Sequence, residues 1–193
     1  MKKLLPLIAV IVLAGAGCGR ATPSTSGTAT NVAKDSGAPT NPIVNKKYDS
    51  CVLFVKTDAE AVLGVKVNEP VHSGAATEDQ ATIVSTCSYS TAGETPADVK
   101  VASLLVRKAK DTAEAVRVFD EARGLSKTLS GVDPVDVSDL GDRAYWAGGA
   151  LNQLNVLKGD AWLILNIQDK KSKTVQLQAT EAARRALDKM ARL

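Results

Sequence analysis

Apolar side chains open the chain as one continuous run and recur later only in short periodic patterns. Two lysines precede an apolar stretch over residues 4–14, and the small residues 15–17 separate that stretch from Cys18. The stretch is about 11 residues long, whereas a helix that spans a bilayer needs about 20. This arrangement is typical of an export signal that is removed, and it does not predict a permanent membrane-spanning helix.

Large apolar side chains almost disappear between Gly19 and Asn45. Thr, Ser, Gly, Ala, Asn and Pro make up most of this stretch. Because such a composition cannot bury enough apolar surface to offset the entropy of ordering, we expect a flexible linker. A flexible linker of this length has a root-mean-square reach of roughly 25–30 Å, which is enough to hold a small domain clear of a membrane surface.

Alternation of apolar and polar residues predicts a series of strands after the linker. Their expected ranges are 65–68, 83–90, 99–106, 134–137, 144–146, 151–157 and 161–167. The sequence Lys158-Gly159-Asp160 is a turn signal between the last two ranges, so these two strands should pair antiparallel.

Helix signals surround these strands. Thr57 and Asp111 each stand three residues before a glutamate, which is the pattern of a capping box at a helix start. We expect the first helix to end at Gly64 and the second at Gly124, because glycine is favoured just after a helix. An apolar stripe predicts a third helix within residues 174–192. Strands joined by short turns need helices to cover them, so the sequence predicts an α+β domain with a twisted antiparallel sheet and helices packed on its faces, an α/β/α sandwich.

Positive charge does not dominate the mature chain. The full sequence has 24 Lys and Arg against 21 Asp and Glu, but cleavage before Cys18 removes Lys2 and Lys3 and leaves 22 basic side chains. The two signs are interspersed along the chain. This near balance gives no reason to expect a nucleic-acid partner.

Cys51 and Cys87 remain as a pair once Cys18 is assigned to the leader. In an exported protein an even pair of cysteines predicts a disulfide. Closing a loop of this length would stabilise the fold by about 3–4 kcal/mol. The alternative is a redox pair or a thiolate nucleophile, but such cysteines are usually closely spaced at a helix start, and no Cys-x-x-Cys sequence occurs. We therefore favour a structural disulfide.

Residues that carry most enzymatic chemistry are sparse. His72 is the only histidine, and neither Gly-x-Ser-x-Gly nor His-Glu-x-x-His occurs. We therefore expect His72 to be an ordinary exposed residue, not a catalytic one.

Asp133, Asp136, Asp139 and Asp142 recur at every third position but lack the Asp-x-Asp-x-Asp-Gly spacing of a calcium loop. We expect turn and cap roles for these aspartates, and neither a metal nor a cofactor.

Tyr145, Trp146 and Trp162 are the candidates for a partner or ligand surface. Tyr145 and Trp146 are adjacent on an expected strand, so they should face opposite sides of the sheet. An aromatic side chain that stays partly exposed would contribute to a binding surface. Packing in the core is the alternative for each of the three residues, and the favoured one.

The leader resembles a bacterial lipoprotein signal peptide, because its small residues end directly at Cys18. This resemblance implies that Cys18 is lipidated, for example with palmitate, and becomes the first residue of the mature protein. The implied division of the chain is a signal peptide over 1–17, a lipidated N-terminus and flexible linker over 18–46, and a globular α+β domain over 47–193.

The domain resembles a family of uncharacterised lipoproteins that are common in actinobacteria. The shared elements are Cys51 before a short helix ending in Leu63-Gly64, a second cysteine in Cys87-Ser88-Tyr89, and a Gly-Asp-x-Ala-aromatic segment within 140–146. The expected fold is also similar to that of the extrinsic photosystem II subunit P, a sandwich that generally serves as a binding or assembly module. Neither resemblance implies a catalytic residue.

These features predict a non-enzymatic lipoprotein on the extracytoplasmic face of the cell membrane. Its membrane contact would be the lipid anchor, and its partner an envelope protein that it binds or helps to assemble. The alternative is a carrier of lipid or another small apolar ligand, which needs an internal apolar cavity of roughly several hundred Å³. A hydrolase would instead require a polar cleft that brings Asp or Glu beside His72.

Replacing Cys18 tests the predicted anchor. In the variant Cys18→Ala, the acyl chains have no attachment point, so we expect the protein to leave the membrane fraction and to incorporate no labelled palmitate. Fractionation and palmitate labelling of wild type and variant in the same host measure this. A variant that stays membrane-bound and still incorporates palmitate would show that Cys18 is not the anchor.

Overall fold

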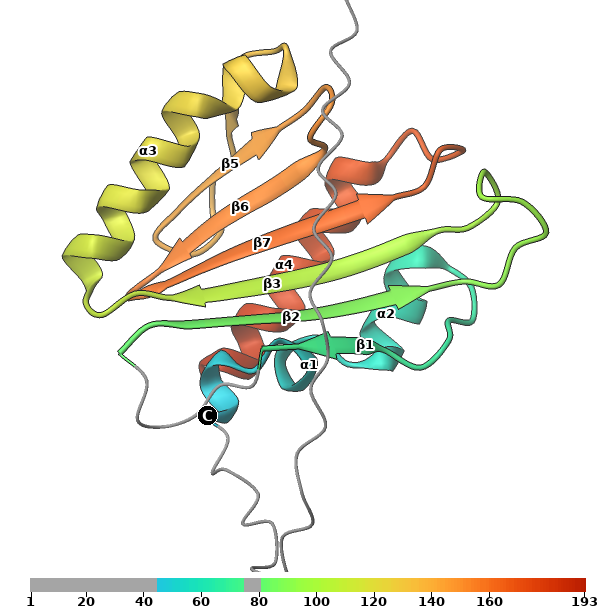
Figure 1. The fold of residues 1–193 in the computed structure, drawn as a ribbon, viewed down its shortest axis with the longest axis horizontal. Coiled ribbons are helices and arrows are strands. Elements are labelled where there is room, and N and C mark those ends of the chain that lie inside the picture. The colour runs from blue at the N-terminus through green and yellow to red at the C-terminus, as the bar shows by residue number, and fades with distance from the viewer. Residues whose placement is uncertain (1–44, 75–80) are drawn as a thin grey trace, which may run out of the picture. The chain divides into compact units, whose positions relative to one another are not determined.

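The computed structural model describes residues 45–74 and 81–193, which form one antiparallel sheet with helices on both faces (Figure 1). The predicted signal peptide, Cys18 and most of the predicted linker lie outside the described residues. In spatial order the sheet is β1-β2-β3-β7-β6-β5-β4. The strands are β1 (Val71–Ser73), β2 (Ile83–Ser90), β3 (Val101–Lys108), β4 (Val135–Asp136), β5 (Arg143–Ala147), β6 (Gln153–Lys158) and β7 (Ala161–Gln168).

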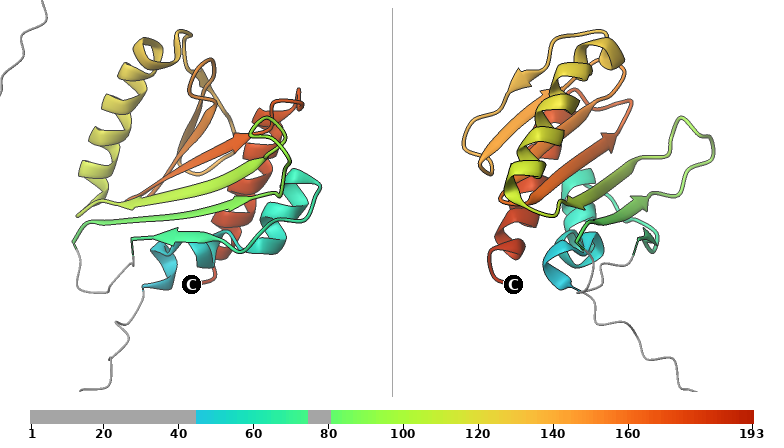
Figure 2. Two further views of the ribbon diagram at one scale, coloured as in Figure 1. Left: turned by 45° about the vertical axis from the view of Figure 1, so that its right-hand side comes forward. Right: turned by 60° about the vertical axis from the view of Figure 1, so that its left-hand side comes forward.

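The helices divide unequally between the two faces of the sheet. A 3-10 turn, η1 (Lys46–Tyr48), leads into α1 (Ser50–Leu53) and α2 (Lys56–Leu63), and these pack with α4 (Val175–Met190) on one face. The other face carries α3 (Thr112–Ser130) (Figures 1 and 2). The α+β class and the placement of helices on both faces are therefore confirmed. In the described ranges, no helix is long and apolar enough to span a membrane.

The main core lies between the sheet and α4. Four alanines on α4 are fully buried against the strands: Ala179, Ala182, Ala183 and Ala186. Because their side chains are small, the helix can approach the sheet closely. Alternate residues of the central strands, such as Leu104 of β3 and Leu163 and Leu165 of β7, fill the space beneath the helix and are fully buried.

Several element predictions are confirmed by the structure. The range 83–90 is β2, and 161–167 falls within β7, one residue shorter. The last helix lies inside the predicted range 174–192. Asp111 caps α3 as predicted, with its side chain accepting a hydrogen bond from the Glu114 backbone N–H at 2.8 Å.

Two helix boundaries were predicted wrongly. The helix α3 does not stop at Gly124 but continues to Ser130 and ends at Gly131, where φ is 81°. One glycine inside a helix costs only about 1 kcal/mol. The helix therefore continues past Gly124, and buried Ser126 extends its sheet-facing side beyond that glycine. The helix α2 begins at Lys56, and the Asp58 carboxylate, not Glu60, accepts the Val55 backbone N–H at 3.0 Å.

The segment 65–68, predicted as a strand, is irregular. Two hydrogen bonds link it to the sheet among the described residues: the Asn68 backbone N–H donates to the Ser90 carbonyl at 2.8 Å, and the Asn68 Nδ2 donates to the Ser90 Oγ at 3.5 Å. The edge strand is instead β1, three residues later, which pairs with β2 through Val71↔Ser88 and its neighbours. A four-residue alternation is therefore too short to locate an edge strand.

The predicted pairing of Cys51 with Cys87 is present, with a Cα–Cα distance of 5.1 Å. This bond joins α1 to β2. Because α1 is only four residues long, the disulfide is a main constraint on the position of the chain where it enters the domain.

Removing the disulfide should lower the free energy of unfolding by about 3–4 kcal/mol, because the unfolded chain then regains the entropy of an open loop. The double variant Cys51→Ala/Cys87→Ala avoids a free thiol, and urea unfolding against wild type measures the change. A loss below about 1 kcal/mol would contradict a stabilising role for this bond.

Candidate functional site

The helix α3 covers only half of its face of the sheet. It packs on β5, β6 and β7, and no described helix lies over β1, β2 and β3 on that side (Figure 2). Beneath α3, Phe119 stands edge-on to Tyr145 and Trp162, with ring centroids 5.1 and 6.2 Å apart. This small second core holds the helix in place and leaves the rest of the face open.

A groove of about 210 Å³ lies between the second half of α3 and strands β6 and β7. We call it the α3 groove. The residues that define it are Leu125, Leu129, Tyr145, Asn155, Trp162 and Ile164. None of these side chains is charged, so the groove offers a ligand mainly apolar contact.

Leu125 and Leu129 form the outer wall of the α3 groove. They are 59% and 63% exposed, whereas Ala115, Val118 and Phe119 of the same helix are buried. The two leucines are four residues apart and therefore neighbours on one side of the helix. The two leucines therefore place adjacent exposed apolar side chains beside the groove.

Several polar groups at the α3 groove are already bonded within the protein. The Trp162 indole Nε1–H donates to the Asn155 Oδ1 at 3.2 Å, and Asn155 is buried. The Ser126 hydroxyl lies 3.5 Å from the Tyr145 hydroxyl. Burial raises the pKa of Tyr145, so its hydroxyl stays neutral.

The floor of the α3 groove continues onto β3 and β2. Leu105 pairs in register with Ile164, and Arg107 with Trp162, so these residues share one face of the sheet. We call the uncovered part of this face the sheet shelf. Its defining residues are Val84, Thr86, Ser88, Ser103, Leu105 and Arg107. Most of them are short, which lets the backbone of a bound segment approach the sheet.

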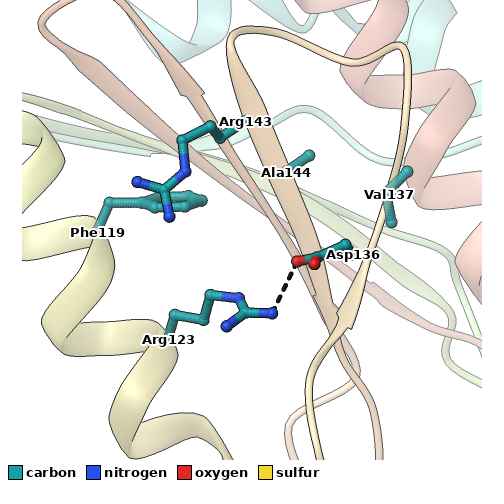
Figure 3. Close-up of a pocket in the computed structure, with 6 residues that line it drawn as sticks. All are labelled: Phe119, Arg123, Asp136, Val137, Arg143 and Ala144. Carbon is teal, nitrogen blue, oxygen red and sulfur yellow. Dashed lines mark hydrogen bonds and ion pairs between the residues drawn. The ribbon is translucent and has the colours of Figure 1, made fainter.

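A second cavity, of about 350 Å³, lies at the other side of α3, towards β4 and β5 (Figure 3). Its two guanidinium groups already have carboxylate partners. Arg123 bonds Asp136 at 2.8 Å, and Arg143 bonds both oxygens of Asp120 at 2.5 and 3.1 Å. The Arg143 bond holds the pKa of Asp120 below its usual value. These neutralised pairs tie α3 to the sheet edge and leave little attraction for an anion.

The surroundings of His72 were not foreseen from the sequence. His72 Nε2 lies 3.3 Å from the Ser85 Oγ and 3.6 Å from the Asp49 Oδ1, so a serine, a histidine and an aspartate do meet. Both contacts use the same ring nitrogen, whereas a catalytic triad needs one on each. Ser85 is fully buried and bonded to Ser50 at 2.8 Å.

Asp49 has a structural role that accounts for this cluster. Its carboxylate accepts the backbone N–H groups of Cys51 and Val52, at 2.9 and 3.1 Å, and so caps α1. The cluster therefore fastens α1 to β1 and β2 beside the disulfide. An aspartate directly before a short helix is the sequence signal that could have located this cap.

The structure divides the predicted aromatic residues between the two faces of the sheet. Tyr145 and Trp162 meet at the α3 groove, while Trp146 is half-buried against the main core on the opposite face. The opposite facing of Tyr145 and Trp146 agrees with their adjacency on β5. Leu125, Leu129 and Arg107 were missed, the two leucines because they lie beyond the predicted end of their helix.

The four aspartates spaced by three do not converge. Asp133 bonds Lys127 at 3.0 Å, Asp136 bonds Arg123, and Asp142 accepts the Gly159 backbone N–H at 2.7 Å. Asp139 occupies a turn with φ of 58°. Among residues 45–74 and 81–193, no three His, Cys, Asp or Glu side chains are close enough to hold a metal ion.

Comparison of the chain with protein-family models, curated proteins and solved structures finds no match. The resemblances to an actinobacterial lipoprotein family and to the photosystem II subunit P fold therefore stay predictions. What the geometry defines is an α+β domain with an apolar groove on one face.

Substitutions at buried and at exposed positions of α3 should have different effects on the free energy of unfolding. We expect Phe119→Ala to lower the free energy of unfolding by about 3–5 kcal/mol, because it empties the buried second core. Leu125→Ser and Leu129→Ser should each change it by no more than about 0.5 kcal/mol. Urea unfolding of the three variants checks this; a large loss for either leucine would show that it belongs to the core.

Proposed function

We propose that this protein is a lipid-anchored, extracytoplasmic and non-enzymatic binding module, whose α3 groove and sheet shelf contact a protein partner of the cell envelope. The observation that carries the proposal is the exposed pair Leu125 and Leu129 beside an uncovered half of the sheet. Large apolar side chains that are grouped beside an uncovered sheet face, and not scattered singly, are a feature of interaction surfaces.

The size of the α3 groove favours a protein partner over a carried lipid. Its volume of about 210 Å³ is below the range of about 300–1,000 Å³ that pockets for small ligands usually have. The core under α4 is filled by closely packed side chains, including the buried alanines. An exposed patch over a filled core suits an interaction module.

The position of the predicted tether is compatible with this use of the groove. The first described residues form η1, which packs on α1, α4 and β3, and Tyr48 is fixed by its hydroxyl, which donates to the Asp160 carboxylate at 2.8 Å. This is the α4 side of the sheet. The first described residues therefore lie on the face of the sheet opposite the α3 groove.

Site-specific photo-crosslinking in the living host tests the proposal. We place p-benzoylphenylalanine at position 129 in the full chain, and in a second variant at position 177. Leu177 is the matched control because it is 68% exposed on α4, away from the groove. We expect position 129 to give a discrete crosslinked protein, identified by mass spectrometry, and position 177 to give none.

Two other results would contradict the proposal. Equal crosslinking at both positions would mean that contacts at the groove are unspecific. Crosslinks from position 129 to lipid, with lipid retained by the wild-type protein in native mass spectrometry, would establish the carrier function instead. To separate loss of binding from loss of fold, each variant is first compared with wild type by thermal unfolding.

A further inference from the structure

Arg107 is a cation on the sheet shelf without a carboxylate partner among the described residues. Its Nε is enclosed by the protein, and in the described part of the chain it has no hydrogen-bond partner. Arg123 and Arg143, by contrast, are each held by an aspartate. A buried donor without a partner costs free energy, so the described part of the fold gains no stability from the Nε–H of Arg107.

The neighbours of Arg107 are mostly apolar. In the sheet, Arg107 pairs with Trp162 on the neighbouring strand β7 and with Val84 on the neighbouring strand β2. Leu105 lies two residues earlier on β3 and faces the same side. Side chains paired in this way have Cβ atoms about 4.5–5.5 Å apart. Arg107 is therefore adjacent to the wall of the α3 groove that Trp162 forms. In such surroundings a bond to a carboxylate is stronger than in open water.

We propose that the α3 groove and Arg107 together bind a peptide segment of the partner protein in which an acidic side chain stands close to a large apolar one. The apolar side chain lies between Leu125, Leu129 and Ile164. The carboxylate accepts hydrogen bonds from the terminal nitrogens of Arg107. This inference rests on the proposed function and names the chemistry of the partner.

The rest of the sheet shelf favours a peptide over a polyanion. Thr86, Ser88 and Ser103 are short and uncharged, so an extended or helical backbone can lie close to the sheet. Arg107 is the only cation among the defining residues of the shelf and the groove. Nucleic acids are bound through several phosphate contacts at once, which one guanidinium cannot supply.

Peptide selection tests the inference directly. The full lipidated chain is held in phosphatidylglycerol nanodiscs, and phage displaying random 12-residue peptides are selected on it after depletion on empty nanodiscs. We expect enrichment of Asp or Glu within a few positions of Leu, Ile, Phe or Trp. The enriched peptides should bind the Arg107→Gln protein about tenfold more weakly, the loss that one charge-assisted hydrogen bond of about 1.5 kcal/mol implies.

Matched variants make the result specific. Arg184→Gln removes an exposed arginine from α4, on the opposite face, and should leave peptide binding unchanged. Arg107→Lys keeps the charge and should retain part of the affinity. Wild-type binding should weaken with rising salt more steeply than that of Arg107→Gln. If a variant at position 107 folds poorly, the salt dependence of wild-type binding still tests the ionic contact, because it needs no variant.

The outcomes separate this inference from the proposed function. Enriched peptides without acidic residues, or peptides whose affinity is the same for wild type and Arg107→Gln, would overturn the role of Arg107 and leave the groove as a binding site. If Leu129→Ser does not weaken the enriched peptides and position 129 forms no crosslink in the host, the proposed function itself is wrong.

Discussion

The pairing of β3 with β7 is the interaction on which the rest of the structure depends. It joins residues 101–108 to 161–168 in an unbroken antiparallel register, and it places the amino-terminal strands and the carboxyl-terminal strands in one sheet. The residues between them in sequence supply α3 and strands β4, β5 and β6. The helix α4 then contacts β6 and β7 on one side and α1 and α2 on the other, so both halves share one core.

This topology explains why one face of the sheet stays half-open. The chain leaves β3 at its end beside β7 and must reach β4 at the far edge before it returns through β5 and β6. A helix that makes this connection passes over β5, β6 and β7. The strands β1 and β2 lie on the other side of β3, so the connection does not cover them. The sheet shelf is therefore a consequence of strand order. Phe119, wedged between Tyr145 and Trp162, fixes how far α3 extends over the sheet.

Local pattern in the sequence was sufficient for the parts of the fold that local physics determines. Period-two alternation located β2 and β7, and the apolar stripe located α4. The end of α3 was missed because Gly124 is tolerated inside the helix when buried Ser126 continues the stripe. The sheet shelf could not be foreseen at all, since the alignment of Arg107 with Trp162 depends on β3–β7 pairing over more than 50 residues. Tyr145 and Trp162 were named as surface candidates, but only the strand order shows that they share a face while Trp146 does not.

The two faces of the sheet differ in what a partner can gain from them. On the α4 face, the small side chains beneath the helix are already closely packed against the sheet, and the chain enters the domain there. On the α3 face, apolar surface is still exposed, so burying it would contribute affinity. The Arg107 guanidinium is a charged group whose neighbours on the sheet are mostly apolar. A neutral partner that covers Arg107 would leave this charge buried without a counterion, whereas an acidic partner would neutralise it. On this argument the leucines provide the affinity of the groove, and Arg107 provides its selectivity by penalising the wrong partner.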